Sequence, residues 1–369
     1  VGYALSLPGD AADGPRQSQK RKILAKLDPP RLRGLWNAWQ AYGQALTQGL
    51  FADEELRRVF GEALAMSLPQ GGKLRVRLFI QAGAPELHRL AWEALHNPLD
   101  GQPLCMNETI LFSRFLATQD RRALRLPRQG ELGAVLAAAN PDDLADYDLP
   151  PVDAAGELRR ARESLGMPVL AALPGPGRRA TLDEIVDCVR QALKGGAPPL
   201  LYLACHGRLG RDGPELVLED ERGKTALVSG EALAARLGEL SQPPLLVVLA
   251  SCASAGAQAG EALSALGPRL AQAGVPAVLA MQGKISMATV EKMMPVFFGE
   301  LAWDGQVDRA LAVGRGAVRE RPDWWAPVLF TRLKSGRIFR EAEPPREERP
   351  GLFTIPDPPV DFVGREKEL

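Results

Sequence analysis

The sequence predicts an α/β protein whose larger part is an open, mostly parallel sheet flanked by helices. Continuous apolar runs alternate with segments of helical period between residues 132 and 333, and the runs at 200–204 and 245–250 each follow a pair of prolines. These two runs show no polar alternation, which is typical of strands buried on both faces of a parallel sheet. Strands separated by helices imply right-handed crossovers and a doubly wound arrangement.

The larger part, residues 131–340, is predicted to consist of short strands and amphipathic helices. We expect strands at 132–139, 168–172, 200–204, 245–250, 277–281 and 328–333. Helices are expected at 154–165, 182–193, 230–240 and 261–273, and a hairpin over 215–228. In this order several parallel strands end at one edge of the sheet.

The smaller part, residues 1–130, is predicted to be an α/β half that packs on the larger part. We expect strands at 3–7, 73–80 and 109–116 and helices at 31–50, 53–66 and 91–95. Asp53 stands at the N-cap position of the second of these helices. A charged connection that contains a proline spans residues 120–130, so we place the boundary between the two parts near residue 130.

Composition restricts the classes of partner. Of the 369 residues, 46% are hydrophobic and 24% charged, which are values of globular proteins. The 45 Lys and Arg residues balance 45 Asp and Glu residues, so no basic field exists for direct binding of nucleic acid or of an anionic membrane. No apolar run approaches the roughly 18 residues of a membrane span, and residues 1–10 lack the pattern of a signal peptide. We therefore expect a cytoplasmic protein.

The four cysteines are expected to be thiols, because a chain of this size needs no disulfide framework. Cys105 and Cys188 have no His or Cys at metal-ligand spacing, and Cys205 faces the opposite side of its strand from the next residue, so all three are predicted to be core residues. No metal or other cofactor is expected within this chain. Cys252, in contrast, is a candidate nucleophile.

Two reactive side chains follow the two central strands. His206 comes two residues after the strand at 200–204 and precedes Gly207, and Cys252 comes two residues after the strand at 245–250. Ligands of open parallel sheets bind at the carboxyl ends of the strands, and neighbouring strands lie about 4.8 Å apart. If these strands are neighbours, the imidazole and the thiol reach one substrate carbonyl. Read separately, His206 is an ordinary rim residue and Cys252 an ordinary core residue.

Together the two side chains have the chemistry of a nucleophilic cysteine site. A free thiol has a pKa of about 8.5, and the N-terminus of the helix at 261–273 would favour the thiolate of Cys252. His206 would accept the thiol proton or protonate the leaving nitrogen. The backbone N–H groups of Gly207 and Cys252 are the candidate donors to the oxyanion.

Further residues of the site are less defined by the sequence. Gln282, directly after a strand, either lines the substrate cleft or caps a loop. Asp220, on the hairpin, is a second candidate for contact with the substrate. Asp212 and Asp220 are close to His206 only along the chain, so no carboxylate that orients the imidazole is identified.

Between residues 74 and 340 the sequence contains an ordered set of motifs: Leu-Ala-Trp-Glu-Ala-Leu-His, Ala-Cys-His-Gly, Leu-Val-Leu-Glu-Asp-Glu, Val-Val-Leu-Ala-Ser-Cys, Ala-Gly-Val-Pro-Ala-Val-Leu-Ala-Met-Gln and Trp-Ala-Pro-Val-Leu-Phe. This set resembles the CHAT family of caspase-like cysteine peptidases. The resemblance implies a caspase-like sheet with a non-catalytic N-terminal half. It also implies an endopeptidase that cleaves a protein or peptide substrate, with His206 as the general acid and base and Cys252 as the nucleophile.

The C-terminal end of the sequence suggests a larger protein. Residues 341–361 are rich in proline and are expected to form a stiff linker. Residues 362–369 resemble the entry to P-loop ATPase modules of the AAA and signal-transduction classes. The chain also opens on Val1, so we interpret it as a fragment whose missing module would bind ATP and mediate oligomerisation. This arrangement implies an effector of bacterial defence or regulated cell death.

Two other functions compete with this interpretation. The same fold with an idle dyad would be a binding or scaffold module. An amidotransferase-type enzyme would need Gly-x-Cys-x-Gly at its nucleophile, and residues 250–254 do not supply it.

Overall fold

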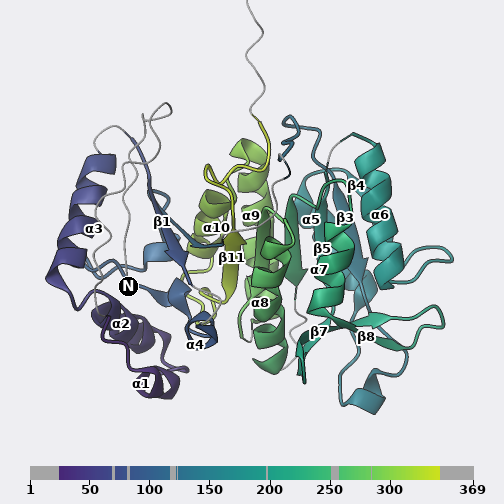
Figure 1. Cartoon of the computed structure of the whole chain (residues 1–369), viewed down its shortest axis with the longest axis horizontal. Helices are drawn as coiled ribbons and strands as arrows, with labels where there is room; N and C mark the ends of the chain where they lie inside the picture. The colour runs from purple at the N-terminus through teal and green to yellow at the C-terminus, as the bar shows by residue number, and fades with distance from the viewer. Residues whose placement is uncertain are drawn as a thin grey trace, which may run out of the picture.

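The computed structural model describes residues 25–68, 71–80, 84–116, 122, 124–196, 198–250, 257–283 and 285–340. Its centre is an eight-stranded sheet in the order β1-β2-β11-β10-β9-β5-β3-β4 (Figure 1). The strands are β1 Leu74–Phe79, β2 Ile110–Phe115, β3 Ala134–Ala138, β4 Val169–Leu173, β5 Leu200–Ala204, β9 Leu246–Ala250, β10 Ala277–Met281 and β11 Pro327–Thr331. All neighbouring pairs are parallel except β10 and β11. The predicted open, mostly parallel sheet is confirmed.

A small antiparallel sheet extends from the end of β5. It contains β6 His206–Gly210, β7 Gly213–Glu219 and β8 Thr225–Ser229, and β7 and β8 form the predicted hairpin. The extra strand β6 was not predicted, and it begins at His206 itself. The candidate imidazole is therefore part of a strand and not of a loop.

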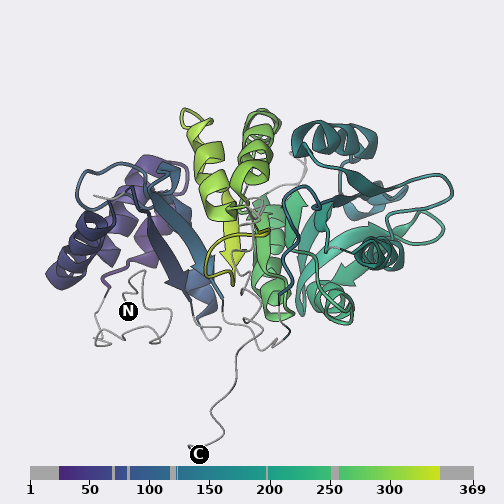
Figure 2. The same ribbon diagram turned by 90° about the horizontal axis from the view of Figure 1, so that it is seen from above.

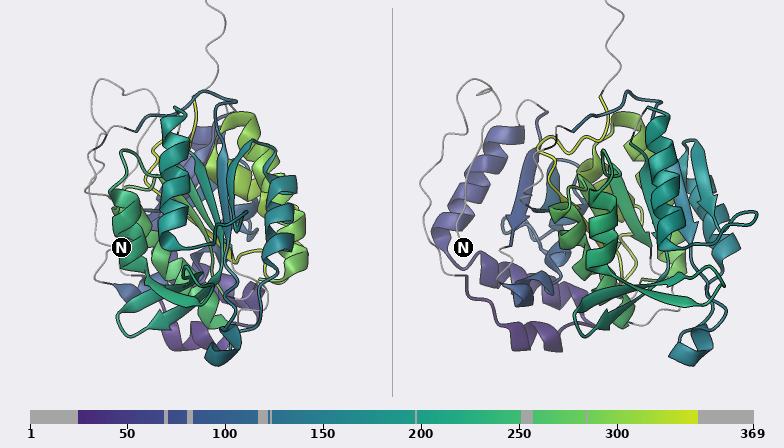
Figure 3. Two further views of the ribbon diagram at one scale, coloured as in Figure 1. Left: turned by 90° about the vertical axis from the view of Figure 1, so that its right-hand side faces the viewer. Right: turned by 45° about the vertical axis from the view of Figure 1, so that its right-hand side comes forward.

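Helices cover both faces of the main sheet, as Figures 2 and 3 show. On one face lie α5 Ala154–Leu165, α9 Met287–Asp304 and α10 Val307–Gly316, and on the other lie α6 Leu182–Lys194, α7 Gly230–Gly238 and α8 Ala257–Gln272. The sequence analysis assigned α5, α6, α7 and α8 but no helix between 281 and 328. Because both faces are covered, the side chains of β3, β5, β9, β10 and β11 are all buried.

The N-terminal part supplies α1 Pro29–Gly34, α2 Trp39–Leu50, α3 Glu54–Ser67 and α4 Pro85–His88, followed by the short 3-10 helix η2 Trp92–Ala94. The single helix expected at 31–50 is wrong, because α1 ends at Gly34 and α2 begins at Trp39. Glycine disfavours helix continuation. In the intervening turn the Trp36 ring packs edge-on against Trp325 and Tyr42.

The strands of the N-terminal part belong to the main sheet. β2 pairs in parallel with β11, with Phe330 opposite Arg114 and Thr331 opposite Phe115. The sheet thus runs without interruption across the predicted boundary near residue 130, which stays a prediction. The strand expected at 3–7, the linker at 341–361 and the ATPase entry at 362–369 lie outside the described residues.

Candidate active site

The register of the two central strands places the predicted site at one edge of the sheet. β5 and β9 are parallel neighbours, and their last residues, Ala204 and Ala250, stand opposite each other. His206 and Cys252 each follow two residues later in the sequence. Cys252 itself lies outside the described residues. Both residues therefore follow the same row of the sheet at the same distance along the sequence.

His206 is held in a defined orientation by a backbone carbonyl. Its side chain is buried, and its Nε2 lies 2.7 Å from the carbonyl oxygen of Pro150. Because a carbonyl oxygen only accepts, Nε2 must carry the proton, which leaves the lone pair on Nδ1. Nδ1 is buried and has no hydrogen-bond partner in the described part of the chain. The sequence analysis found no group that orients His206, because a main-chain carbonyl 56 positions away leaves no signal in side-chain patterns.

Burial also sets the protonation state of this histidine. Desolvation lowers the pKa of His206 below its usual value of 6.5, and the contact with Pro150 opposes the shift only in part. The imidazole is therefore neutral at pH 7. A neutral ring with a free Nδ1 lone pair can accept a proton, which is the property required of a general base.

The other predicted site residues occupy distinct places. Gly207 lies buried in β6 opposite Leu216. Asp220 lies in the turn between β7 and β8, where its Oδ1 accepts hydrogen bonds from the backbone N–H groups of Arg222 and Lys224, at 2.8 Å each. This carboxylate closes a turn in the structure, and its contact with a substrate stays a prediction.

Gln282 follows β10 directly and is buried. Its Oε1 accepts a hydrogen bond from Arg114 at 2.7 Å, and its Nε2 donates to the carbonyl oxygen of Arg89 at 3.0 Å. The side chain also lines a large cavity. Gln282 therefore holds the loop after β10 to the N-terminal part, and its contact with a substrate stays a prediction.

The partner of Gln282 belongs to a buried ion pair that the sequence analysis did not identify. Arg114 and Glu93 form two hydrogen bonds, of 3.0 Å and 2.6 Å, and each side chain is 1% exposed. Arg114 also donates to the carbonyl oxygens of His88 and Leu90, at 2.8 Å and 3.0 Å. The guanidinium thus ties the segment 88–93 to the strand β2 and to the end of β10.

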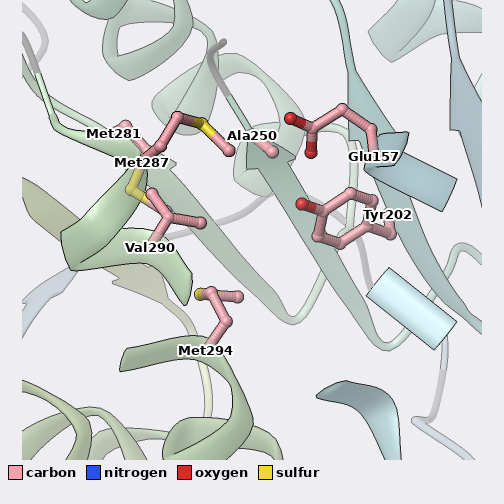
Figure 4. A pocket seen from close by; sticks show the side chains of 7 residues that line it. All are labelled: Glu157, Tyr202, Ala250, Met281, Met287, Val290 and Met294. Atoms are coloured by element: carbon pink, nitrogen blue, oxygen red, sulfur yellow. The ribbon is translucent and has the colours of Figure 1, made fainter. Parts of the chain in front are cut away.

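A small cavity of about 10 Å³ lies at the ends of β9 and β10. Figure 4 shows the Glu157 carboxylate and the Tyr202 hydroxyl pointing into it from one side, opposite a wall of methionine side chains. Glu157 is paired with Arg160 at 2.8 Å. The remaining lining residues are Ala250, Met281, Met287, Val290 and Met294. A space of this size holds about one water molecule.

Cys105, Cys188 and Cys205 are buried, as predicted, and burial raises the pKa of the Cys105 thiol to about 12. Within the described ranges, no three His, Cys, Asp or Glu side chains are grouped as a metal site requires. None of the helices in the described part has the length and apolar character needed to cross a membrane.

An open, mostly parallel α/β sheet with a buried, oriented histidine at its carboxyl edge defines the class of the molecule. The model of the CHAT domain matches residues 40–333. The chain therefore belongs to the CHAT-domain family. No curated protein matches the chain.

Solved structures of low sequence identity are also similar to this chain. The Arg-specific cysteine proteinase gingipain R, from Porphyromonas gingivalis, is 13% identical, with a TM-score of 0.44 over 84% of this chain and 76% of that chain. Separase of Saccharomyces cerevisiae, in complex with securin, is 12% identical, with a TM-score of 0.38 over 67% of this chain. Caspase-1 of Spodoptera frugiperda is 15% identical, with a TM-score of 0.36 over 59% of this chain and 94% of that chain. The similar region spans only 15% of the length of the separase chain.

Proposed function

We propose that this chain is a cysteine endopeptidase that cleaves a protein substrate with a dyad of His206 and Cys252. The observation that carries the proposal is the state of His206: a neutral imidazole, oriented through Nε2, whose Nδ1 lone pair has no partner among the described residues. The carboxyl ends of the parallel strands β5 and β9 lie side by side, which supports the pairing of His206 with Cys252. The family match supports the same reaction class.

The reaction follows from these two groups. Nδ1 of His206 accepts the thiol proton, and the sulfur of Cys252 attacks the carbonyl carbon of the scissile peptide. The oxyanion is stabilised by the backbone N–H groups of Gly207 and Cys252. When the C–N bond breaks, the imidazolium returns its proton to the leaving nitrogen, and a thioester remains. Water, deprotonated by His206, hydrolyses the thioester and regenerates the thiol.

The carbonyl oxygen of Pro150 would take the orienting part in this reaction. It receives the Nε2 proton and fixes the ring so that Nδ1 is the reactive nitrogen. It also stabilises the imidazolium that forms during the reaction, because a carbonyl dipole favours the charged ring. No carboxylate is needed for this task.

We further propose that the peptidase is the effector of a cytoplasmic bacterial defence or regulated cell-death system. Residues 362–369 resemble the start of an ATPase module, which would bind ATP, oligomerise and control the site through the linker at 341–361. An unregulated endopeptidase would damage its own cell. The isolated chain should therefore cleave a broad peptide library much more slowly than the triggered full-length protein, and equal rates would remove this regulatory part of the proposal.

The test of the dyad is a comparison of thiol reactivity and proteolysis. Iodoacetamide at neutral pH should alkylate Cys252 much faster than the buried Cys105, Cys188 and Cys205. Expression of the full-length protein should create new protein termini that the Cys252→Ala protein does not create. If Cys252 is alkylated no faster than the other thiols, and both proteins give the same termini, the chain is an idle scaffold module.

A further inference from the structure

A cavity of about 790 Å³ opens in the described part of the molecule. Its lining residues include residues of α8, of the N-terminal helices α1 and α4, and of the strand β11. Figure 1 shows where these elements lie in the fold. Apolar side chains from both sides face it: Leu32, Trp36, Ile80, Leu116, Leu209 and Phe330. Of these apolar side chains, that of Leu209 is 46% exposed. Cavities of this volume and lining are typical of binding sites.

Lining residues of the cavity lie beside both ends of β11. At one end is Gln282, whose backbone N–H bonds to the carbonyl oxygen of Ala326, just before the strand. At the other end is Leu116, whose N–H bonds to the carbonyl oxygen of Thr331, the last residue of the strand. A strand rises by about 3.3 Å per residue, so these two ends are roughly 15 Å apart. This length fits an extended peptide of about five residues better than a compact small molecule.

The cavity carries an excess of positive charge. Among the described residues, Arg33, Arg89 and Arg269 line it, against the single acid Glu86. None of the three guanidinium groups forms an ion pair with a residue that the structure describes. A ligand with carboxylates at intervals between apolar side chains would match both the charge and the lining.

We propose that this cavity holds an extended segment of the protein substrate, remote from the scissile bond, in which apolar and acidic side chains alternate. The assignment rests on the proposed function, because the cavity begins at the edge of the candidate site. Gln282 follows β10, which is parallel to β9 and ends at the same edge, and Leu209 belongs to β6, which starts at His206. A substrate cleaved at this edge therefore continues into the cavity.

Twin peptides test the chemistry of the cavity without any need for catalysis. One fluorescein-labelled peptide contains alternating Leu, Trp and Glu, and its twin contains Lys in place of every Glu. Fluorescence anisotropy with the Cys252→Ala protein should show binding of the acidic peptide at least tenfold tighter than binding of the basic twin. Equal affinities, a preference for the basic twin, or no binding of either peptide would overturn the proposal.

Charge reversal of the cavity sharpens this test. The triple variant Arg33→Glu, Arg89→Glu and Arg269→Glu should prefer the basic twin. The matched control reverses three exposed arginines that do not line the cavity: Arg159, Arg162 and Arg222. This control should keep the preference for the acidic peptide, and if both triple variants lose it, the preference reflects net charge and the proposal fails. Leu209→Asp, a change of an exposed side chain, should weaken the binding of the acidic peptide severalfold.

A cleavage assay tests whether the segment bound in the cavity is part of the substrate. Joining the acidic segment to a peptide that the active protein cleaves should raise kcat/KM at least tenfold, and the triple variant should abolish that gain. Binding without any gain would overturn the assignment to the substrate. Cleavage that does not depend on Cys252 would instead overturn the proposed function and leave the binding result intact.

Discussion

The central strands and the outer strands of the sheet are held in place by different interactions. β5 and β9 consist of buried hydrophobic residues, and the predicted catalytic residues come only after these strands end. β1 and β2 carry arginines within the sheet, and Arg75 and Arg114 are paired with Asp308 and Glu93. Apolar packing places the ends of the central strands, whereas buried charges fix the N-terminal part and the loop after β10.

This difference teaches that the two parts should respond to change in different ways. An apolar strand loses packing energy in proportion to the volume removed. A buried ion pair is sensitive to the loss of one partner and tolerant of the loss of both, because the penalty comes from the charge that is left without compensation. The predictions below test this contrast.

Removal of the N-terminal part should have the largest effect. A chain of residues 131–340 lacks β2, so β11 becomes an open edge and Phe330 loses the contact with Arg114. Exposed apolar surface and an unpaired strand favour aggregation. We expect insoluble or unstable protein on expression. A soluble fragment that melts cooperatively would show that the central part folds without the outer strands.

Changes at the predicted dyad should abolish cleavage and leave the fold in place. Cys252→Ala and His206→Gln should each reduce kcat/KM roughly 1000-fold or more, since each removes a group that reacts. Gln is chosen because His206 is buried, so Ala would also remove packed volume. Asp212→Asn, a change of an exposed nearby residue, is the control and should retain activity. Retained activity in either dyad variant contradicts the mechanism.

The buried ion pair should show the asymmetry described above. Arg114→Met leaves the Glu93 carboxylate buried without a cation and should lower the free energy of unfolding by about 3–5 kcal/mol. The double variant with Glu93→Leu should recover most of this loss. Leu201→Ala in β5 should cost about 2–5 kcal/mol through packing alone. Urea denaturation measures all three, and a double variant no more stable than Arg114→Met would refute the contrast.

The smallest expected effect is a pH dependence shared by the two parts. Burial lowers the pKa of His96 in the N-terminal part and of His206 in the central part below the usual 6.5. Below pH 6.5 the unfolded chain binds protons that the folded chain excludes, so the free energy of unfolding falls as the pH decreases toward the folded pKa values. Above about pH 7.5 both histidines are neutral in the folded and in the unfolded chain, so they add no pH dependence to the free energy of unfolding.

His96→Gln and His206→Gln separate the two contributions. Each variant should reduce the acid-induced loss of stability, measured by urea denaturation between pH 7.5 and 5. An unchanged slope in both variants would assign the acid sensitivity to other groups.

The central strands could be predicted from the sequence because their signal is local. β5 has the predicted bounds and β9 differs by one residue, since an uninterrupted apolar run after two prolines has few other readings. β6 was missed because residues 206–210 contain two glycines and no alternation. α9 was missed because Pro295, inside the helix, is a usual sign of a helix end.

The contacts that tie distant segments together left no such signal. The carbonyl of Pro150 reaches His206 from a loop, and Glu93 reaches Arg114 across the turn into β2. Both depend on the register of strands and on the course of connecting segments. The predicted edge of the candidate site could be derived from strand order alone, whereas the tautomer of His206 and the hydrogen bonds of Gln282 depend on how distant segments meet in three dimensions.

The pairing of β2 with β11 has a consequence for how the molecule is made. Arg114 and Phe330 are about two hundred residues apart, so closing this pair carries a large loss of chain entropy and delays it. During synthesis β1 and β2 leave the ribosome long before β11, which is the last strand described. Until then the two early strands have an open edge beside Arg114, and the nascent chain is exposed to aggregation and to chaperones. Completion of the sheet therefore waits for nearly the whole domain to be translated.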